Sequence, residues 1–149
     1  ESRGLGDVYK RQQFEQAVTD LHKRNIPVIT HLILGLPGET KEDMLSSVRY
    51  VGSLPVTGIK LQLLHILKGT DLGTAYMADP FPLFTLEEYC DLIADCIALL
   101  PPEIVIHRLT GDGPRNLLLA PLWSTDKKRV LNTIQKCLRE RDLWQGKNI

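Results

Sequence analysis

Three short segments of this sequence combine the glycine, basic and polar residues that ligand-binding sites use. They are residues 35–40, residues 65–70 and residues 107–112. Each follows an apolar, β-branched run that is typical of a strand, and the functional groups of parallel α/β proteins gather at the carboxyl ends of strands. We therefore expect the three segments to line one rim if their strands are neighbours.

The first segment is a glycine turn between a predicted strand and a predicted helix. A phosphate-binding P-loop that began at Gly35 would need glycine and a Ser or Thr hydroxyl where this chain has Thr40 and Glu42. The motif fails. What remains is a turn and a helix start that can present backbone N–H groups to a ligand, although the local chemistry slightly favours a tight turn alone.

The second segment places His65 and Lys68 after a strand that carries polar residues on one face. A lone histidine is more often a structural hydrogen-bonding group than a catalytic one, and a lysine beside a glycine is usually solvated. Within the strand, Lys60, Gln62 and Leu64 share one face. An ammonium and an amide inside a sheet are costly without polar partners, so this face favours a polar cavity such as a cofactor-binding barrel lumen.

The third segment joins His107 and Arg108 to a loop that contains Asp112. The guanidinium fork of arginine binds carboxylate or phosphate groups, and a salt bridge from Arg108 to Asp112 is an equally good interpretation. The sequence has neither the Ser/His/Asp order of a hydrolase nor an HExxH zinc motif. The three cysteines, Cys90, Cys96 and Cys137, lack metal-ligand spacing and lie on apolar helical stripes, which indicates core packing.

The periodicity of apolar residues predicts the elements that would position these segments. Helices are expected at residues 14–25, after residue 40, after residue 85 and at residues 126–142, and strands at residues 28–34, 59–67 and 104–108. The strand at residues 28–34 should be buried on both faces. Pro80 and Pro82 should keep residues 71–84 irregular. Residues 117–123 are ambiguous, and residues 1–12 have the character of a non-native lead-in.

The alternation of helices and strands indicates an α/β fold with parallel strands and a C-terminal helix. Three strands are too few to close a barrel of about eight, so the fold is a small open sheet or a segment of a larger barrel. Lys+Arg and Asp+Glu both number 18, and this zero net charge argues against a strong nucleic-acid surface. No apolar run approaches a membrane span of roughly 20 residues, and we expect a cytoplasmic protein without a membrane partner.

Three stretches together resemble the radical S-adenosylmethionine (SAM) family, and most of all its YhcC-like subfamily. They are THLILGLPGET at residues 30–40, GIKLQLLHILKGT at residues 58–70, and IHRLTGDGP at residues 106–114 with LAPLW at residues 119–123. The first stretch is shared by many radical SAM branches. All three in this order and spacing make the subfamily match strong.

The resemblance implies a fragment of a partial (β/α)6 TIM-like barrel, with residues 13–100 in the barrel and residues 101–149 in a C-terminal region. It implies a SAM site at Ile33, Gly35, His65 and Leu67. It implies substrate-side positions at Gln62, Lys68, His107, Arg108 and Asp112. In the full-length parent it also implies a 4Fe-4S cluster and reductive cleavage of SAM to a 5′-deoxyadenosyl radical, acting on an unknown small molecule or on tRNA.

One departure from the family limits what this chain can do by itself. Radical SAM enzymes hold their cluster through Cys-x3-Cys-x2-Cys, and this chain contains no such motif. We therefore expect no metal ligands here and no activity without a cluster-binding half. Two other hypotheses stay open: a non-catalytic α/β module that docks RNA or a protein partner, and a half-barrel that binds a phosphorylated metabolite at the Gly35 turn.

Overall fold

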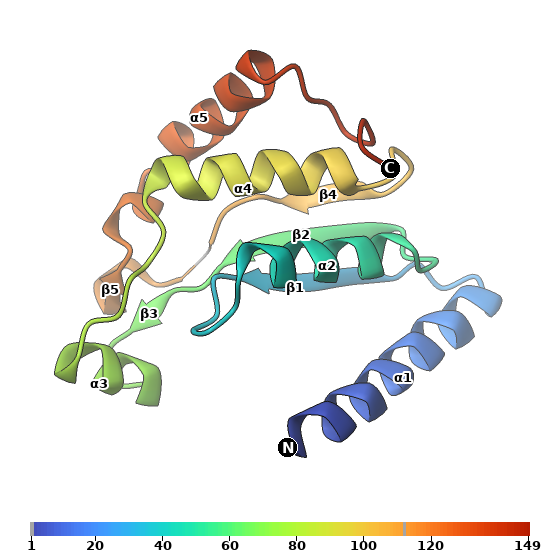
Figure 1. Cartoon of the computed structure of the whole chain (residues 1–149), viewed down its shortest axis with the longest axis horizontal. Coiled ribbons are helices and arrows are strands. Elements are labelled where there is room, and N and C mark those ends of the chain that lie inside the picture. The colour runs from blue at the N-terminus through green and yellow to red at the C-terminus, as the bar shows by residue number, and fades with distance from the viewer. Residues whose placement is uncertain (1, 112) are drawn as a thin grey trace.

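The fold alternates helices and strands along most of the chain (Figure 1). The structure, a computed structural model, describes residues 2–111 and 113–149, and for residues 2–9 it describes the backbone alone. The strands are β1 (Ile29–Leu34), β2 (Gly58–Leu63), β3 (Ile66–Leu67), β4 (Val105–Arg108) and β5 (Leu118–Ala120). The α-helices are α1 (Ser2–Lys23), α2 (Lys41–Gly52), α3 (Asp71–Ala78), α4 (Leu86–Leu99) and α5 (Lys127–Glu140). Two 3-10 helices lie at Arg115–Leu117 and Leu122–Thr125.

A three-stranded sheet in the order β1-β2-β4 is the centre of the fold. Both strand pairs are parallel, as the alternation of elements predicts. Strand β1 pairs with β2 without interruption from Ile29 opposite Gly58 to Leu34 opposite Leu63. The β2–β4 pairing shifts register after Ile59, so that Lys60 lies opposite Arg108. A second, antiparallel pair joins β3 to β5 beyond the carboxyl end of this sheet.

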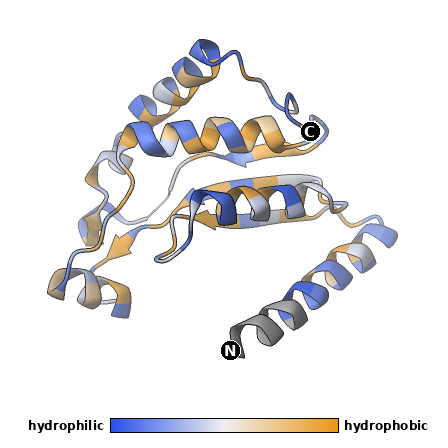
Figure 2. Cartoon of the chain, in the orientation of Figure 1, coloured by the Kyte–Doolittle hydropathy of each residue, from blue (hydrophilic) through white to orange (hydrophobic). Residues whose placement is uncertain are grey.

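One face of the parallel sheet is covered by helices. The fully buried Leu34, Ile59 and Leu61 point into a core that α2 and α4 complete, and α5 packs on the outer side of α4 (Figure 1). Figure 2 shows polar and apolar residues alternating along these helices, as amphipathic helices require. The core is therefore a sandwich of sheet, helix pair and outer helix.

Local capping fixes where the helices begin. Thr40 and Asp43 form a reciprocal capping box at the start of α2, and Thr85 and Glu88 form another at the start of α4. Each box satisfies two N–H groups that would otherwise lack partners. Asp126 accepts a hydrogen bond from the N–H of Arg129 at the start of α5. All three helix starts agree with the sequence predictions.

Several predicted elements differ from the structure. The strand expected at residues 59–67 divides into β2 and β3, with a break at residues 64–65. The segment expected to be irregular contains α3, because Thr70 caps that helix before Pro80 and Pro82 are reached. The ambiguous segment forms β5 and a 3-10 helix, and α1 begins at Ser2 rather than near residue 14.

Strand β1 is not buried on both faces, and that prediction is wrong for this chain. Thr30 and Leu34 are buried against the helices, whereas Ile29 and Ile33 on the other face are 43% and 44% exposed. The strand is also the outer strand of its sheet. An apolar run shows that a strand is suited to double burial, but it does not supply the layer that would cover the second face.

Candidate functional site at the carboxyl edge of the sheet

The three segments singled out in the sequence do share one edge of the fold. Because β1, β2 and β4 are parallel and adjacent, their carboxyl ends lie side by side, and the segments after residues 34, 63 and 108 leave from this rim. The pairing of β3 with β5 then ties the second segment to the chain that follows the third. The expectation of a shared rim is confirmed.

Gly35 is the residue at which β1 turns toward α2. Its φ of +91° lies in the left-handed region that favours glycine, and a Cβ atom added here would lie 3.2 Å from Cε2 of Phe84. Its N–H donates to the sulfur of Met44 at 3.3 Å. A pocket of about 250 Å³ opens beside the turn, between residues 35–39 and residues 81–84. The absence of a Cβ atom thus lets the Gly35 backbone lie close to the ring of Phe84.

His65 lies between β2 and β3, and the loop that follows β4 packs against its ring. A Cβ atom on Gly111 would overlap Nε2 of the imidazole, and one on Gly113 would lie 2.6 Å from Nδ1. The two glycines therefore let the loop pass closely over the ring. This contact joins the second segment to the third, although Asp112, predicted to face the substrate, lies outside the described residues.

Leu67 and Lys68 are positioned by the antiparallel pairing of β3 with β5. Leu67 lies opposite Leu118, and the N–H of Lys68 donates to the carbonyl of Leu117 at 2.8 Å. The Lys68 side chain is exposed, while Leu67 is half-buried and 3.5 Å from a Cβ position at Gly113. Leu67 thus belongs with His65, and Lys68 does not join that cluster.

The face of the sheet opposite the helices holds the remaining candidates. Ile33 lies beside Gln62 in register, and one residue pair earlier on the same face His31 lies beside Lys60. His107 extends over Gly58, since a Cβ on that glycine would lie 2.5 Å from Nε2 of the ring. Arg108 is the half-buried register partner of Lys60. Ile33, Gln62, His107 and Arg108 are therefore brought together on or beside one face.

Two residues that the sequence interpretation did not assign hold the rim in place. The hydroxyl of the fully buried Tyr89 donates to the carbonyl of Leu109 at 2.7 Å, and burial raises the pKa of this phenol. Trp123 donates from Nε1 to the carbonyl of Phe84 at 3.0 Å. Tyr89 packs against both aromatic rings. The helical spacing of Tyr89 marks it as core, but no pattern names its partner.

The cysteines are packing residues, as expected. Cys90 and Cys96 are buried in the core, and burial raises the pKa of each thiol to about 12. Cys137 is half-buried beside Asp91, and burial also raises the pKa of its thiol. Thiols that resist ionisation are poor metal ligands. Within residues 2–111 and 113–149, no group of three or more His, Cys, Asp or Glu side chains could hold a metal ion.

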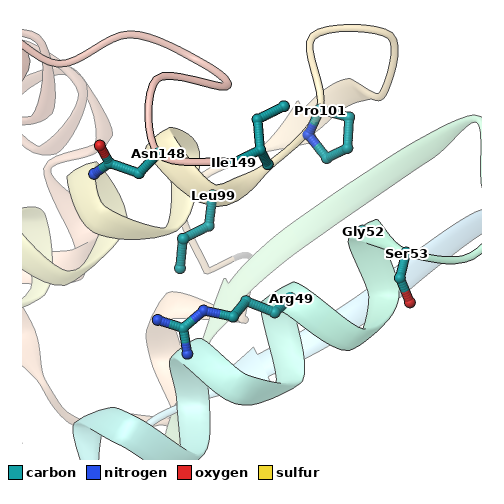
Figure 3. A pocket seen from close by; sticks show the side chains of 7 residues that line it. All are labelled: Arg49, Gly52, Ser53, Leu99, Pro101, Asn148 and Ile149. Carbon is teal, nitrogen blue, oxygen red and sulfur yellow. The ribbon is translucent and has the colours of Figure 1, made fainter.

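Another pocket, of about 320 Å³, lies between the ends of α2 and α4 (Figure 3). Arg49 and Ser53 line it on one side, and Leu99, Pro101 and Ile149 on the other. Because α2 ends just before β2 begins, this pocket is at the amino edge of the sheet and does not share the rim. The helices of the described chain are all too short or too polar to cross a membrane.

Comparison with known proteins identifies the family to which this arrangement belongs. Residues 56–140 match the family described as the Radical_SAM C-terminal domain. This chain belongs to the radical SAM family. It is 40% identical over 134 residues to YtqA of Bacillus subtilis and 36% identical over 126 residues to YhcC of Escherichia coli K12. These alignments cover 90% and 84% of the chain but 42% and 41% of the relatives. The chain therefore spans about two fifths of their length.

A solved structure of the archaeal Elp3 of Methanocaldococcus infernus, with residues 1–46 deleted, shares the fold. It superposes with a TM-score of 0.72 over 90% of this chain and 32% of the Elp3 chain, at 17% sequence identity. The predicted radical SAM resemblance and its α/β barrel-type fold are confirmed, including the YhcC-like relationship. The relationship implies SAM and a 4Fe-4S cluster in the parent family, whereas the three cysteines here lack the spacing to ligate that cluster.

Proposed function

We propose that this radical SAM chain forms the adenosine-contacting and substrate-facing side of a SAM site within a longer enzyme. The observation that carries the proposal is the bare face and carboxyl edge of the parallel sheet, where Ile33 lies beside Gln62, Gly35 follows, and no helix of the described residues covers the face. Cofactor sites in α/β folds lie at this edge. In this family the bound cofactor supplies radical chemistry, and the protein supplies binding, orientation and exclusion of water.

The residues at the rim suit an adenosine group. Ile33 offers an exposed apolar side chain at the end of β1, and Gly35 has a positive φ that lets its backbone approach a flat ring. Gln62, the neighbour of Ile33 in register, carries an amide that can donate to and accept from ring nitrogens. His65, overlain by Gly111 and Gly113, holds the adjoining loop at the same edge.

The cluster ligands are assigned to a part of the enzyme outside this chain. Cys90 and Cys96 lie in the core with raised pKa values, and none of the three cysteines is spaced to bind iron. On this proposal, the chain taken alone contributes binding surface and no radical chemistry. Its substrate, a small molecule or tRNA, binds on the bare face.

Two isoleucines of β1 provide a matched test. Ile33 and Ile29 are about equally exposed, on the same face, at opposite ends of the strand. In the complete, cluster-loaded protein, Ile33→Ala should weaken binding of S-adenosylhomocysteine about tenfold, because covering the lost methyl and methylene groups contributes about 1–2 kcal/mol. Equilibrium dialysis measures this binding without requiring turnover.

Ile29→Ala is the control, and its affinity for S-adenosylhomocysteine should stay within about twofold of wild type. We expect this because four residues of a strand span about 13 Å, which places Ile29 far from a cofactor bound at Ile33. Equal losses in both variants would show a general effect on the strand. No loss in Ile33→Ala would remove the end of β1 from the proposed cofactor site.

A further inference from the structure

A row of basic side chains crosses the bare face one level below the proposed adenosine contacts. Lys60, at the centre of the middle strand, lies between two register partners, His31 on β1 and Arg108 on β4. His107 reaches the same face, because its imidazole lies over Gly58. Three strands thus contribute nitrogen-bearing side chains at nearly the same height in the sheet.

The described strand residues of this face include no acidic side chain that could pair with Lys60. The described strand residues that share the face are Ile29, His31, Ile33, Gly58, Lys60, Gln62, Val105 and His107, and none carries a carboxylate. The helix-covered side differs, since Asp91 and Asp95 there pair with Lys41 and Arg141. Placing an ammonium group in the middle of a sheet is costly unless an anion meets it. An anion that pairs with the Lys60 ammonium group on the bare face must therefore come from outside these strands.

We infer that Lys60, with His31 and His107 beside it, binds an oxyanion group of the substrate, either a carboxylate or a phosphate. This inference rests on the proposed function for the location of the site and adds the chemical class of the ligand. Lys60 supplies the positive charge. The imidazole nitrogens of His31 and His107 supply directional hydrogen bonds from either side. Lys60 and His31 lie two residues before Gln62 and Ile33 on their strands, so that the oxyanion lies farther from the carboxyl edge of the sheet than the adenosine.

The 149-residue chain allows a direct test with inorganic phosphate as the probe. Amide chemical shifts, followed by NMR during a phosphate titration at constant ionic strength, should change mainly along β1, β2 and β4. Lys60→Gln should raise the dissociation constant at least tenfold, and Lys60→Met, which keeps the apolar stem, should do the same. If one variant fails to fold by circular dichroism, the other gives the result.

Lys136→Gln is the matched control, because Lys136 is an exposed lysine on α5 whose loss changes the net charge equally. Its dissociation constant should stay within about twofold of wild type. An equal loss in both variants, or no binding by the wild-type chain, overturns the inference. Repeating the titration with succinate identifies the anion: tighter phosphate binding indicates a phosphorylated substrate, and tighter succinate binding indicates a carboxylate.

A competition experiment in the complete protein separates this inference from the proposed function. S-adenosylhomocysteine also carries a carboxylate, and it should leave phosphate binding unchanged if Lys60 serves the substrate. Displacement of phosphate by S-adenosylhomocysteine would assign the row to the cofactor and overturn the inference. The Ile33 test depends on neither titration, so either proposal can fail while the other succeeds.

Discussion

The two faces of the parallel sheet are built from the same strands and have opposite properties. On the helix-covered face, Leu34, Ile59 and Leu61 are fully buried. On the bare face, Ile29 and Ile33 are more than two-fifths exposed, and polar residues lie between them and along the neighbouring strands. The covered face therefore holds the chain together, and the bare face is available for binding. Strict alternation of side chains allows one strand to serve both purposes.

The charged side chains also differ between the helix-covered side and the bare face. Around the helices, Asp95 accepts from Arg141 at 2.6 Å and contacts Lys41 at 2.8 Å, so the acid is shared by two bases from different elements. On the bare face, by contrast, Lys60 lies beside His31, and the described strand residues of that face include no acid. The charges on the helical side are paired within the fold, whereas Lys60 is the charge that we propose binds a ligand. The predictions below test this contrast through stability measurements.

The largest effect is expected from a pair of isoleucine substitutions on opposite faces. Ile59→Ala should lower the free energy of unfolding by about 2–5 kcal/mol, because the side chain is fully buried and leaves a cavity. Ile33→Ala should change it by less than about 0.5 kcal/mol, because that side chain is already 44% exposed. Urea unfolding followed by circular dichroism measures both. Similar losses would mean that the bare face also contributes to the stability of the chain.

A smaller effect is expected at the turn that joins the two faces. Gly35→Ala should cost about 2–3 kcal/mol, since alanine at a φ of +91° is strained and its Cβ would crowd Phe84. Gly38→Ala is the control: its φ is +84°, but no atom lies within 4 Å of the new Cβ, so only the strain of about 1–2 kcal/mol remains. Equal costs in thermal unfolding would show that Phe84 yields and that the close approach is unimportant.

The sequence was a good guide wherever local chemistry decides the structure. The capping boxes at Thr40 and Thr85 are complete in four residues each, and Asn25 ends α1 at a φ of 58° as expected. Period-two alternation correctly separated Lys60 and Gln62 from Ile59 and Leu61. These features depend on neighbours in sequence, which a single chain always shows.

Features that depend on distant partners could not be read from the sequence. Nothing near His65 indicates that two glycines more than forty residues later lie over its ring, although the Gly111-x-Gly113 spacing is a faint signal. Pro80 and Pro82 do not prevent α3, because this helix starts at the Thr70 cap and ends at Ala78, before either proline. The exposure of β1 depends on a covering layer that no residue of the strand encodes. Tertiary partners, rather than propensities, account for each of these differences.

The smallest effect concerns the paired charges near the helices and depends on pH. Burial by itself would raise the pKa of Asp95, but hydrogen bonds and charges from Lys41 and Arg141 hold it below its usual value of 3.8. A lowered pKa stabilises the fold fully above the unfolded-state pKa, and that contribution is lost as pH falls through the folded-state pKa. Asp95→Asn should therefore cost about 1 kcal/mol at pH 6, and the difference from wild type should vanish progressively below pH 3.8.

Asp79→Asn provides the matched control for this measurement, because Asp79 is an exposed carboxylate after α3, on a different element from Lys41 and Arg141. Urea unfolding of the three proteins at several values between pH 6 and pH 3 gives the comparison. The curve for Asp79→Asn should run parallel to that of wild type, while the curve for Asp95→Asn converges on it as the solution becomes more acidic. A gap for Asp95→Asn that stays constant with pH would mean that packing, and not the shared charge, explains its position. The helix-covered side would then hold together without its ion pairs, and the contrast in charge between the two faces would no longer bear on stability.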